Sequence, residues 1–124
     1  MARSLVAILV ANLVAFLVAN PARAQDAERG RDLYESRCFA CHSLDANRIG
    51  PMHRGVYGRK AGSVAGFNYS SAVKNSRVVW NDDTLARWLT NPQDVIPGQR
   101  MNFRVATAED RADIVAYLKK ESGK

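Results

Sequence analysis

The sequence has 124 residues, 47% of them hydrophobic, which is consistent with a single small domain. Its 18 basic and 12 acidic residues give a formal net charge of +6, which suits nucleic acid, an anionic membrane or an acidic protein as partner. No basic run is interleaved with aromatic residues, so the sequence argues against a nucleic-acid-binding protein. There is no internal repeat and no sign of a second domain.

The first 24 residues have the pattern of a secretory signal peptide. A basic start at Arg3 is followed by an apolar stretch over residues 5–19 and then by small residues up to Ala24. The alternative is an uncleaved anchor, but this stretch, which Asn12 interrupts, is shorter than the roughly 20 residues that span a bilayer. We expect cleavage after Ala24, no stable membrane insertion, and a mature domain over 25–124 in the periplasm.

The first helix of that domain is predicted from Asp26, a candidate N-cap, to about Arg37. Gly30 lies inside it, where glycine costs about 1 kcal/mol relative to alanine. Such a glycine is either tolerated or required by the close approach of another helix. We favour close approach, because Tyr34 lies one turn further along the same face.

Residues 38–42 read Cys-Phe-Ala-Cys-His, and Cys-x-x-Cys-His is the attachment signature of c-type haem. Cys38 and Cys41 lie on one face of a helical turn, where both can bond the vinyl groups along one porphyrin edge. His42 follows immediately and can direct its imidazole at the iron. The motif predicts one covalently attached haem c with His42 as an axial ligand.

A cysteine pair at this spacing also occurs in disulfides, zinc sites and thiol-disulfide exchange enzymes. A structural zinc site needs four ligands, whereas the chain offers these two cysteines, His42 and one further histidine, His53. Exchange enzymes place the pair near a βαβ pattern, and no run of β-branched residues precedes Cys38. Haem attachment is favoured, and in so small a domain the haem is expected to form part of the core.

Two long loops are predicted over 43–60 and 61–69, because glycine and proline interrupt both segments. Loops of this length in a compact domain usually have a function or a ligand to pack on. Here the predicted ligand is the haem.

Beyond these loops, a short helix with a serine cap is predicted over about 70–75, followed by an extended piece at 78–80. A longer helix is predicted to be capped by Asp82 and stopped by Asn91-Pro92.

The last helix has the clearest pattern in the domain. Thr107 begins a sequence like a capping box, the apolar stripe lies within 114–118, and Gly123 ends the helix. The predicted fold class is therefore all-α, a few helices joined by long loops.

The sixth position of the iron has three candidate ligands: Met52, His53 and Met101. Met52 and His53 follow His42 closely and are expected to stay on its side. Met101 follows a Pro-Gly turn at 97–98 and can close over the opposite face. A methionine opposite histidine favours ferrous iron and electron transfer, so we predict Met101 as the second ligand over its alternative as a core residue.

From about Gly30 to its end, the sequence resembles the class I monohaem cytochromes c, which include the mitochondrial protein and soluble bacterial electron carriers. The resemblance implies an all-α fold wrapped around one haem, in which the first and last helices cross with Gly30 and Tyr34 against Tyr117. It rests on residues 38–42, 50–51, 57–62, 66–69, 80, 96–101 and 113–118.

The resemblance also assigns roles around the haem. The Pro51 carbonyl is expected to accept a hydrogen bond from the His42 ring. Arg59, Tyr69 and Trp80 fall where the family screens a buried haem propionate, a group that is costly to bury without donors.

Four positions depart from the family pattern. His53 stands where leucine is common, Trp88 replaces a tyrosine near the methionine sulfur, Val73 replaces an asparagine, and Gln99 replaces a threonine.

The resemblance implies a soluble, monomeric periplasmic carrier that moves one electron between redox complexes and is not an enzyme. A quinol-oxidising cytochrome bc complex is the expected donor, and an oxidase, a reaction centre or a periplasmic dehydrogenase are candidate partners. Arg37, Arg48, Arg100 and Arg104 are expected to surround the haem edge and steer these partners. The alternatives are a haem enzyme or gas-binding cytochrome with a displaceable sixth ligand, and a thiol oxidoreductase.

Overall fold

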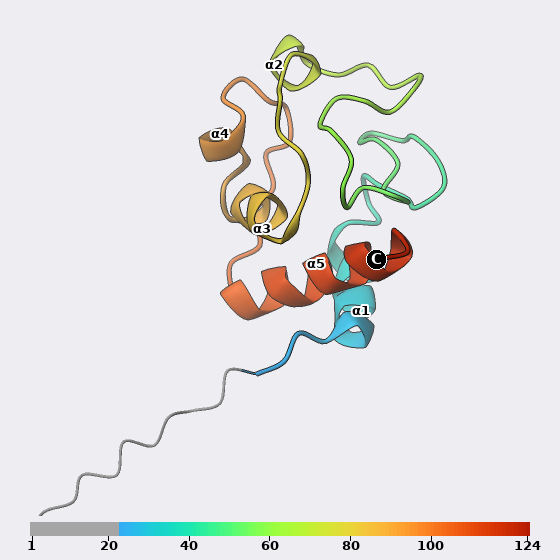
Figure 1. The fold of residues 1–124 in the computed structure, drawn as a ribbon, viewed down its shortest axis with the longest axis vertical. Coiled ribbons are helices and arrows are strands. Elements are labelled where there is room, and N and C mark those ends of the chain that lie inside the picture. The colour runs from blue at the N-terminus through green and yellow to red at the C-terminus, as the bar shows by residue number, and fades with distance from the viewer. Residues whose placement is uncertain (1–22) are drawn as a thin grey trace, which may run out of the picture.

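A computed structural model describes residues 23–124, and most of the predicted signal peptide lies outside this range. The described residues contain helices but no strand, apart from one isolated bridge between Lys60 and Val79, and the all-α prediction is confirmed (Figure 1). None of these helices is long and apolar enough to cross a membrane. In chain order they are α1 (Ala27–Arg37), α2 (Ser71–Lys74), α3 (Asp82–Thr90), α4 (Pro92–Val95) and α5 (Ala108–Glu121).

Helices α1 and α5 cross at Gly30, as predicted (Figure 1). A Cβ atom on Gly30 would lie only 1.9 Å from the carbonyl oxygen of Asp113 in α5. One turn further on, the rings of Tyr34 and Tyr117 pack with their centroids 5.3 Å apart. The absence of a side chain at Gly30 therefore lets the two helix backbones touch.

A buried carboxylate ties the same two helices together. Asp113 is 1% exposed and accepts hydrogen bonds from the backbone amide of Asp26 at 2.8 Å and from the Arg29 guanidinium at 2.6 Å. Asp110, one turn earlier, pairs with Arg29 and with Arg37. Burial by itself raises the pKa of Asp113, but the amide and guanidinium donors hold that pKa below its usual value.

Polar caps set most of the helix starts. Asp26 caps α1 and Thr107 caps α5, both as predicted, and the serine cap predicted for α2 is Ser70. The predicted cap of α3 was wrong by one residue, because Asn81 rather than Asp82 makes the reciprocal hydrogen bonds of a capping box. Asp82 instead lies in the first turn, where its charge favours the helix dipole.

The short helix α4 was not predicted. Pro92 was read only as the residue that stops α3, and it does follow the C-cap of that helix, Asn91. Proline is also well suited to the first position of a helix, where no backbone donor is needed. Pro92 therefore ends one helix and starts the next.

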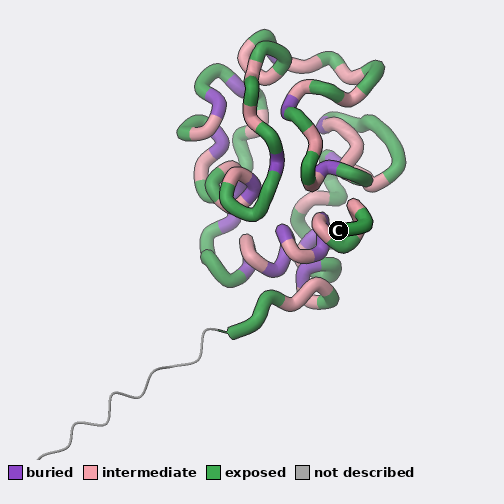
Figure 2. The backbone as a smooth tube through the Cα atoms, in the orientation of Figure 1, coloured by how far each residue is buried: buried purple, intermediate pink, exposed green. Residues whose placement is uncertain are grey.

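The apolar core is centred on α5, which contacts both α1 and α3, and the long loops cover the rest of the molecule with less buried backbone (Figure 2). Leu85 and Leu89 of α3 pack towards Ile114, Val115 and Leu118 of α5. Leu85, Leu89, Ile114 and Leu118 also line a large cavity, so the helical core forms one wall of the site described next.

Candidate cofactor site

A cavity of about 530 Å³ lies between the helical core and the two long loops. Its wall is mostly apolar and includes segments from α1 to α5. Residues far apart in the sequence thus meet around one space. The lining includes every site residue predicted from the sequence: Cys38, Cys41, His42, Pro51, Arg59, Tyr69, Trp80 and Met101.

The two cysteines lie at the end of α1. Cys38 is the C-cap of that helix, and the chain continues in a tight turn in which the His42 amide donates to the Cys38 carbonyl at 2.9 Å. Both thiols are free. Burial raises the pKa of Cys38 to about 11, whereas thiol-disulfide exchange depends on a thiol with a lowered pKa.

Arg48 holds this turn closed. Its guanidinium donates to the backbone carbonyl of Phe39 and, at 3.1 Å, to that of His42. From the sequence, Arg48 was predicted only to be a surface charge at the haem edge. Its structural role was missed because its carbonyl partners belong to a turn whose geometry the sequence does not give.

The imidazole of His42 is buried and held through one nitrogen. Its Nδ1 lies 2.9 Å from the Pro51 carbonyl oxygen, and because a carbonyl only accepts, Nδ1 must carry the proton. Nε2 then keeps its lone pair. Burial lowers the pKa of His42, which favours the neutral imidazole that binds metal ions.

Gly50 provides the room for this ring. A Cβ atom at that position would lie 2.1 Å from Cε1 of His42. The Gly50-Pro51 pair in the sequence therefore has two separate effects: the glycine admits the ring and the proline carbonyl orients it.

Met101 is the one sulfur ligand candidate outside the cysteine motif that lines the cavity within residues 23–124. It follows the turn at Gly98, where φ is +91°, and its sulfur accepts a hydrogen bond from Trp88 Nε1 at 3.2 Å. Met52 does not line the cavity. His53 does, but its ring stacks on that of His42, on the side where it was expected.

The three residues assigned to a propionate also reach the cavity, although their present hydrogen bonds are local. Arg59 donates to the Met52 carbonyl at 2.7 Å, and the Tyr69 hydroxyl accepts from the Val64 amide at 3.1 Å. Trp80 packs edge-on against Trp88. Burial lowers the pKa of Arg59, and a carboxylate beside this guanidinium would raise that pKa and stabilise the buried charge.

The departures from the family pattern differ in their surroundings. Gln99 is buried, and its Oε1 has no hydrogen-bond partner among the described residues. Val73 lines the cavity without a polar atom to offer. Trp88 contacts the Met101 sulfur as a donor, so the tyrosine-to-tryptophan change keeps a donor at this place.

The residues around the cavity fit a haem. Two free thiols, a neutral imidazole and a thioether share a mostly apolar wall, and no cluster of three or more His, Cys, Asp or Glu suited to another metal occurs in residues 23–124. An all-α chain with these groups around one cavity defines a small protein with a covalently attached haem.

Comparison with known proteins gives the family. The family model for cytochrome c matches residues 27–122, and the chain therefore belongs to the cytochrome c family. Cytochrome c from Euglena viridis is 47% identical over 97 residues, which cover 76% of this chain and 95% of the relative. Cytochrome c 2.1 from Caenorhabditis elegans is 45% identical over 104 residues, covering 82% and 94%.

A solved structure supports the same assignment. Cytochrome cH from Methylobacterium extorquens aligns with a TM-score of 0.72 at 37% identity, over 77% of this chain and 98% of that structure. The expected class I monohaem cytochrome c fold is confirmed. The chain is an electron-transfer protein with covalently attached haem c and iron, and its Cys38 and Cys41 lie in the attachment motif.

Proposed function

We propose that this protein is an exported one-electron carrier in which His42 and Met101 are the two axial ligands of the haem iron. The haem supplies the redox couple, ferric and ferrous iron. The observation that carries the proposal is that an imidazole with a free lone pair and a thioether, far apart in sequence, line the same cavity.

The residues around the cavity would hold the haem in a fixed position, so that it can exchange electrons without binding a substrate. The Pro51 carbonyl orients the His42 ring, and Trp88 holds the Met101 sulfur. With haem bound, His42 and Met101 would hold the iron and leave no site for an exogenous ligand, and their fixed positions would limit rearrangement when the oxidation state changes. Arg59, Tyr69 and Trp80 are proposed to stabilise a buried propionate.

The ligand assignment is tested by visible spectroscopy of the purified ferric protein. Wild-type protein should show the charge-transfer band of methionine-ligated haem, and Met101→Ala should lose it. Met52→Ala is the matched control and should keep the band, because Met52 does not line the cavity. Ready binding of carbon monoxide to the wild-type ferrous form would instead support the gas-binding or enzymatic alternative.

The proposed location is the periplasm, with residues 1–24 removed as a signal peptide. The argument is the order of basic, apolar and small residues in that segment. Cleavage would remove Arg23, which pairs with Asp113, but Arg29 would still pair with that carboxylate. Mass spectrometry of the exported protein should give a chain that begins at Gln25 and carries one haem.

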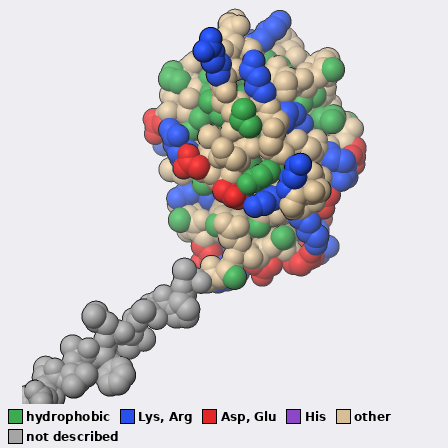
Figure 3. Space-filling model, in the orientation of Figure 1, with side chains coloured by type: hydrophobic (Ala, Val, Ile, Leu, Met, Phe, Trp, Pro, Cys, Tyr) green, Lys and Arg blue, Asp and Glu red, His purple; other side chains and the backbone are tan. Residues whose placement is uncertain are grey.

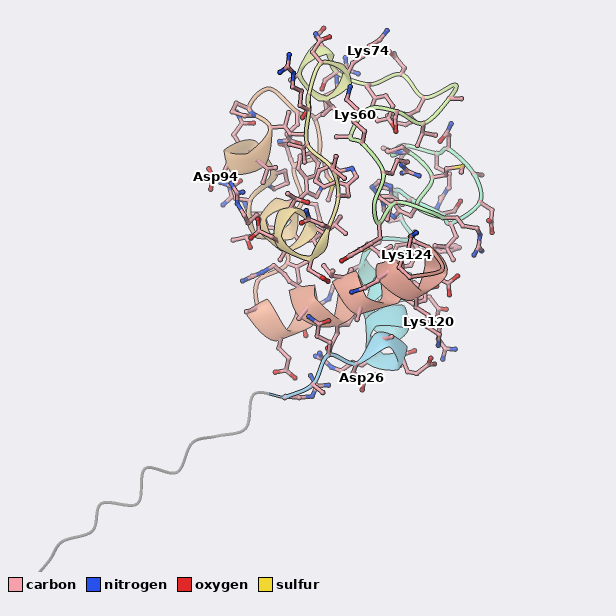
Figure 4. All side chains as sticks on the ribbon, viewed as in Figure 1. Asp26, Lys60, Lys74, Asp94, Lys120 and Lys124 are labelled. Atoms are coloured by element: carbon pink, nitrogen blue, oxygen red, sulfur yellow. The ribbon has the colours of Figure 1, made fainter. Side chains whose placement is uncertain are left out.

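The proposed partners are acidic redox complexes: a quinol-oxidising cytochrome bc complex as donor, with an oxidase, a reaction centre or a periplasmic dehydrogenase as the other partner. Figure 4 places Lys60 and Lys74 at the end of the molecule away from α1 and α5. On the face shown in Figure 3, basic side chains gather at that end, whereas both signs mix elsewhere. Ile49 and Phe103 border the cavity and are 77% and 39% exposed, which supplies an apolar contact.

Two of the arginines expected to steer partners are occupied within the chain. Arg37 pairs with Asp110, and Arg48 closes the cysteine turn. Arg100, which lines the cavity and is exposed, is the better candidate for steering. Arg100→Gln should slow association with an acidic partner at low salt, and Arg31→Gln, away from the cavity, is the control. A rate that does not change with salt would contradict steering.

A further inference from the structure

His53 has a place in the structure that the proposed function does not use. Its ring lies against the ring of His42, with centroids 3.9 Å apart and planes inclined by 17°. On its other side, Nδ1 of His53 lies 3.0 Å from the hydroxyl oxygen of Tyr34. The leucine that is common at this position could pack against His42 but could not form this hydrogen bond.

Both ends of the Tyr34–His53 pair are fixed. Tyr34 is 1% exposed and lies in α1 at the crossing with α5, where its ring packs on Tyr117. The His53 backbone is held by its amide, which donates to the Ser43 carbonyl at 3.0 Å. Burial lowers the pKa of His53 and raises that of Tyr34, so the contact joins two neutral groups. A rigid helix crossing is thereby connected to the face of the His42 ring.

The hydrogen bond to Pro51 does not by itself determine the orientation of the His42 ring. The second side-chain torsion of histidine is broad, and a ring held by one hydrogen bond can still turn about that contact. A second ring stacked on its face restricts this rotation, because turning would break the stacked contact or push His53 away from Tyr34.

We propose that His53 is a positioning residue that sets the plane of the His42 imidazole, and that the hydroxyl of Tyr34, whose ring also lines the cavity, acts on the haem site by holding His53. This proposal rests on the proposed ligation of iron by His42. It concerns orientation, so its effect should be seen in the electronic asymmetry of the ferric haem, which follows the planes of the axial ligands.

The test compares proton NMR spectra of the ferric holoproteins, in which the hyperfine-shifted haem methyl signals report ligand orientation. His53→Leu should change the spread and pattern of these signals. Tyr34→Phe, which removes only the hydroxyl, should produce a smaller change in the same direction. His53→Phe keeps a ring against His42 but cannot bond to Tyr34, so it should resemble Tyr34→Phe.

The double variant decides whether Tyr34 acts through His53. In a His53→Leu background, Tyr34→Phe should cause no further shift, since the hydroxyl no longer has its partner. Tyr117→Phe is the matched control, because it removes a hydroxyl from the adjacent ring outside the pair, and it should leave the methyl signals in place. Equal effects of Tyr34→Phe in both backgrounds would overturn the proposal, as would an unchanged spectrum in His53→Leu and His53→Phe.

The wild-type spectrum separates this proposal from the proposed function. If ferric wild-type protein lacks the low-spin spectrum and the methionine charge-transfer band, the ligation fails and the positioning role fails with it. If both are present while the His53 variants keep the wild-type methyl signals, the carrier function stands and only the positioning role is wrong.

Discussion

At the crossing of α1 and α5, Gly30→Ala is predicted to destabilise the folded protein, although helix propensity alone favours alanine. Alanine is normally favoured over glycine inside a helix by about 1 kcal/mol. In Gly30→Ala, however, the new Cβ would lie 1.9 Å from the Asp113 carbonyl oxygen, whereas Cβ atoms essentially never come closer than 3.0 Å to another heavy atom. The obstacle is backbone, so α1 must move away from α5 by at least about 1 Å.

The size of the effect follows from two opposing contributions. Overpacking typically costs about 1–3 kcal/mol, and a backbone obstacle places this site at the upper end. Subtracting the propensity gain leaves a loss of about 2 kcal/mol, which corresponds to a melting temperature lower by about 8–16 °C for a domain of this size.

Thermal unfolding of the holoprotein, followed by circular dichroism, measures this loss. Glu35 is exposed in the same helix, so Glu35→Ala and Glu35→Gly calibrate the propensity difference without a helix contact. Alanine should be the more stable of the two at Glu35 and glycine at Gly30. A Gly30→Ala protein as stable as wild type would refute the steric argument.

Three further predictions concern charge, ligand environment and the cofactor. Because the pKa of Asp113 is lowered in the folded state, its stabilisation is present above the usual value of about 3.9 and is lost as the pH falls through the folded pKa. Asp113→Asn should lower the free energy of unfolding by about 2 kcal/mol at pH 7 and weaken its dependence on pH in the acid range, as measured by urea unfolding. The loss is smaller than for a fully buried pair because Arg29 is 38% exposed. Trp88→Phe removes the hydrogen-bond donor to the Met101 sulfur, and the positive end of that donor disfavours ferric iron. The reduction potential should therefore fall by at most about 40 mV, since a hydrogen bond contributes about 1 kcal/mol. A higher potential of the variant in voltammetry would contradict this. Without haem, a cavity of about 530 Å³ at roughly 24 cal/mol per Å³ costs about 13 kcal/mol as an upper limit, so the haem-free chain should lack a cooperative thermal transition.

The helix starts that could be predicted from the sequence depend on contacts between residues that are close together in the chain. Caps at Asp26, Ser70 and Thr107 each act within one helical turn, and their donors are fixed by the helix itself. At the start of α3, Asp82 was predicted as the cap from the sequence, whereas Asn81 caps the helix in the structure. Asn81 is the cap because it forms reciprocal hydrogen bonds with Thr84, and these bonds depend on the backbone conformation at the start of the helix.

The eight predicted site residues all reach one cavity, but the sequence could not give their contacts. Arg48 was read as a solvated charge and instead donates to the cysteine turn. His53 was noted only as a departure from the common leucine, and in the structure it bridges Tyr34 and His42. In both cases the partners are atoms of a loop or a distant helix, and loop geometry does not follow from residue type.

The sequence by itself determined the chemistry of this protein: a local motif of two thiols and an imidazole specifies covalent haem, because bonding to one porphyrin edge requires that spacing. Only the tertiary structure decided how the imidazole is held and which sulfur shares its cavity. Those outcomes depend on the crossing of α1 with α5 and on the path of the loops, which bring together segments that the sequence keeps apart.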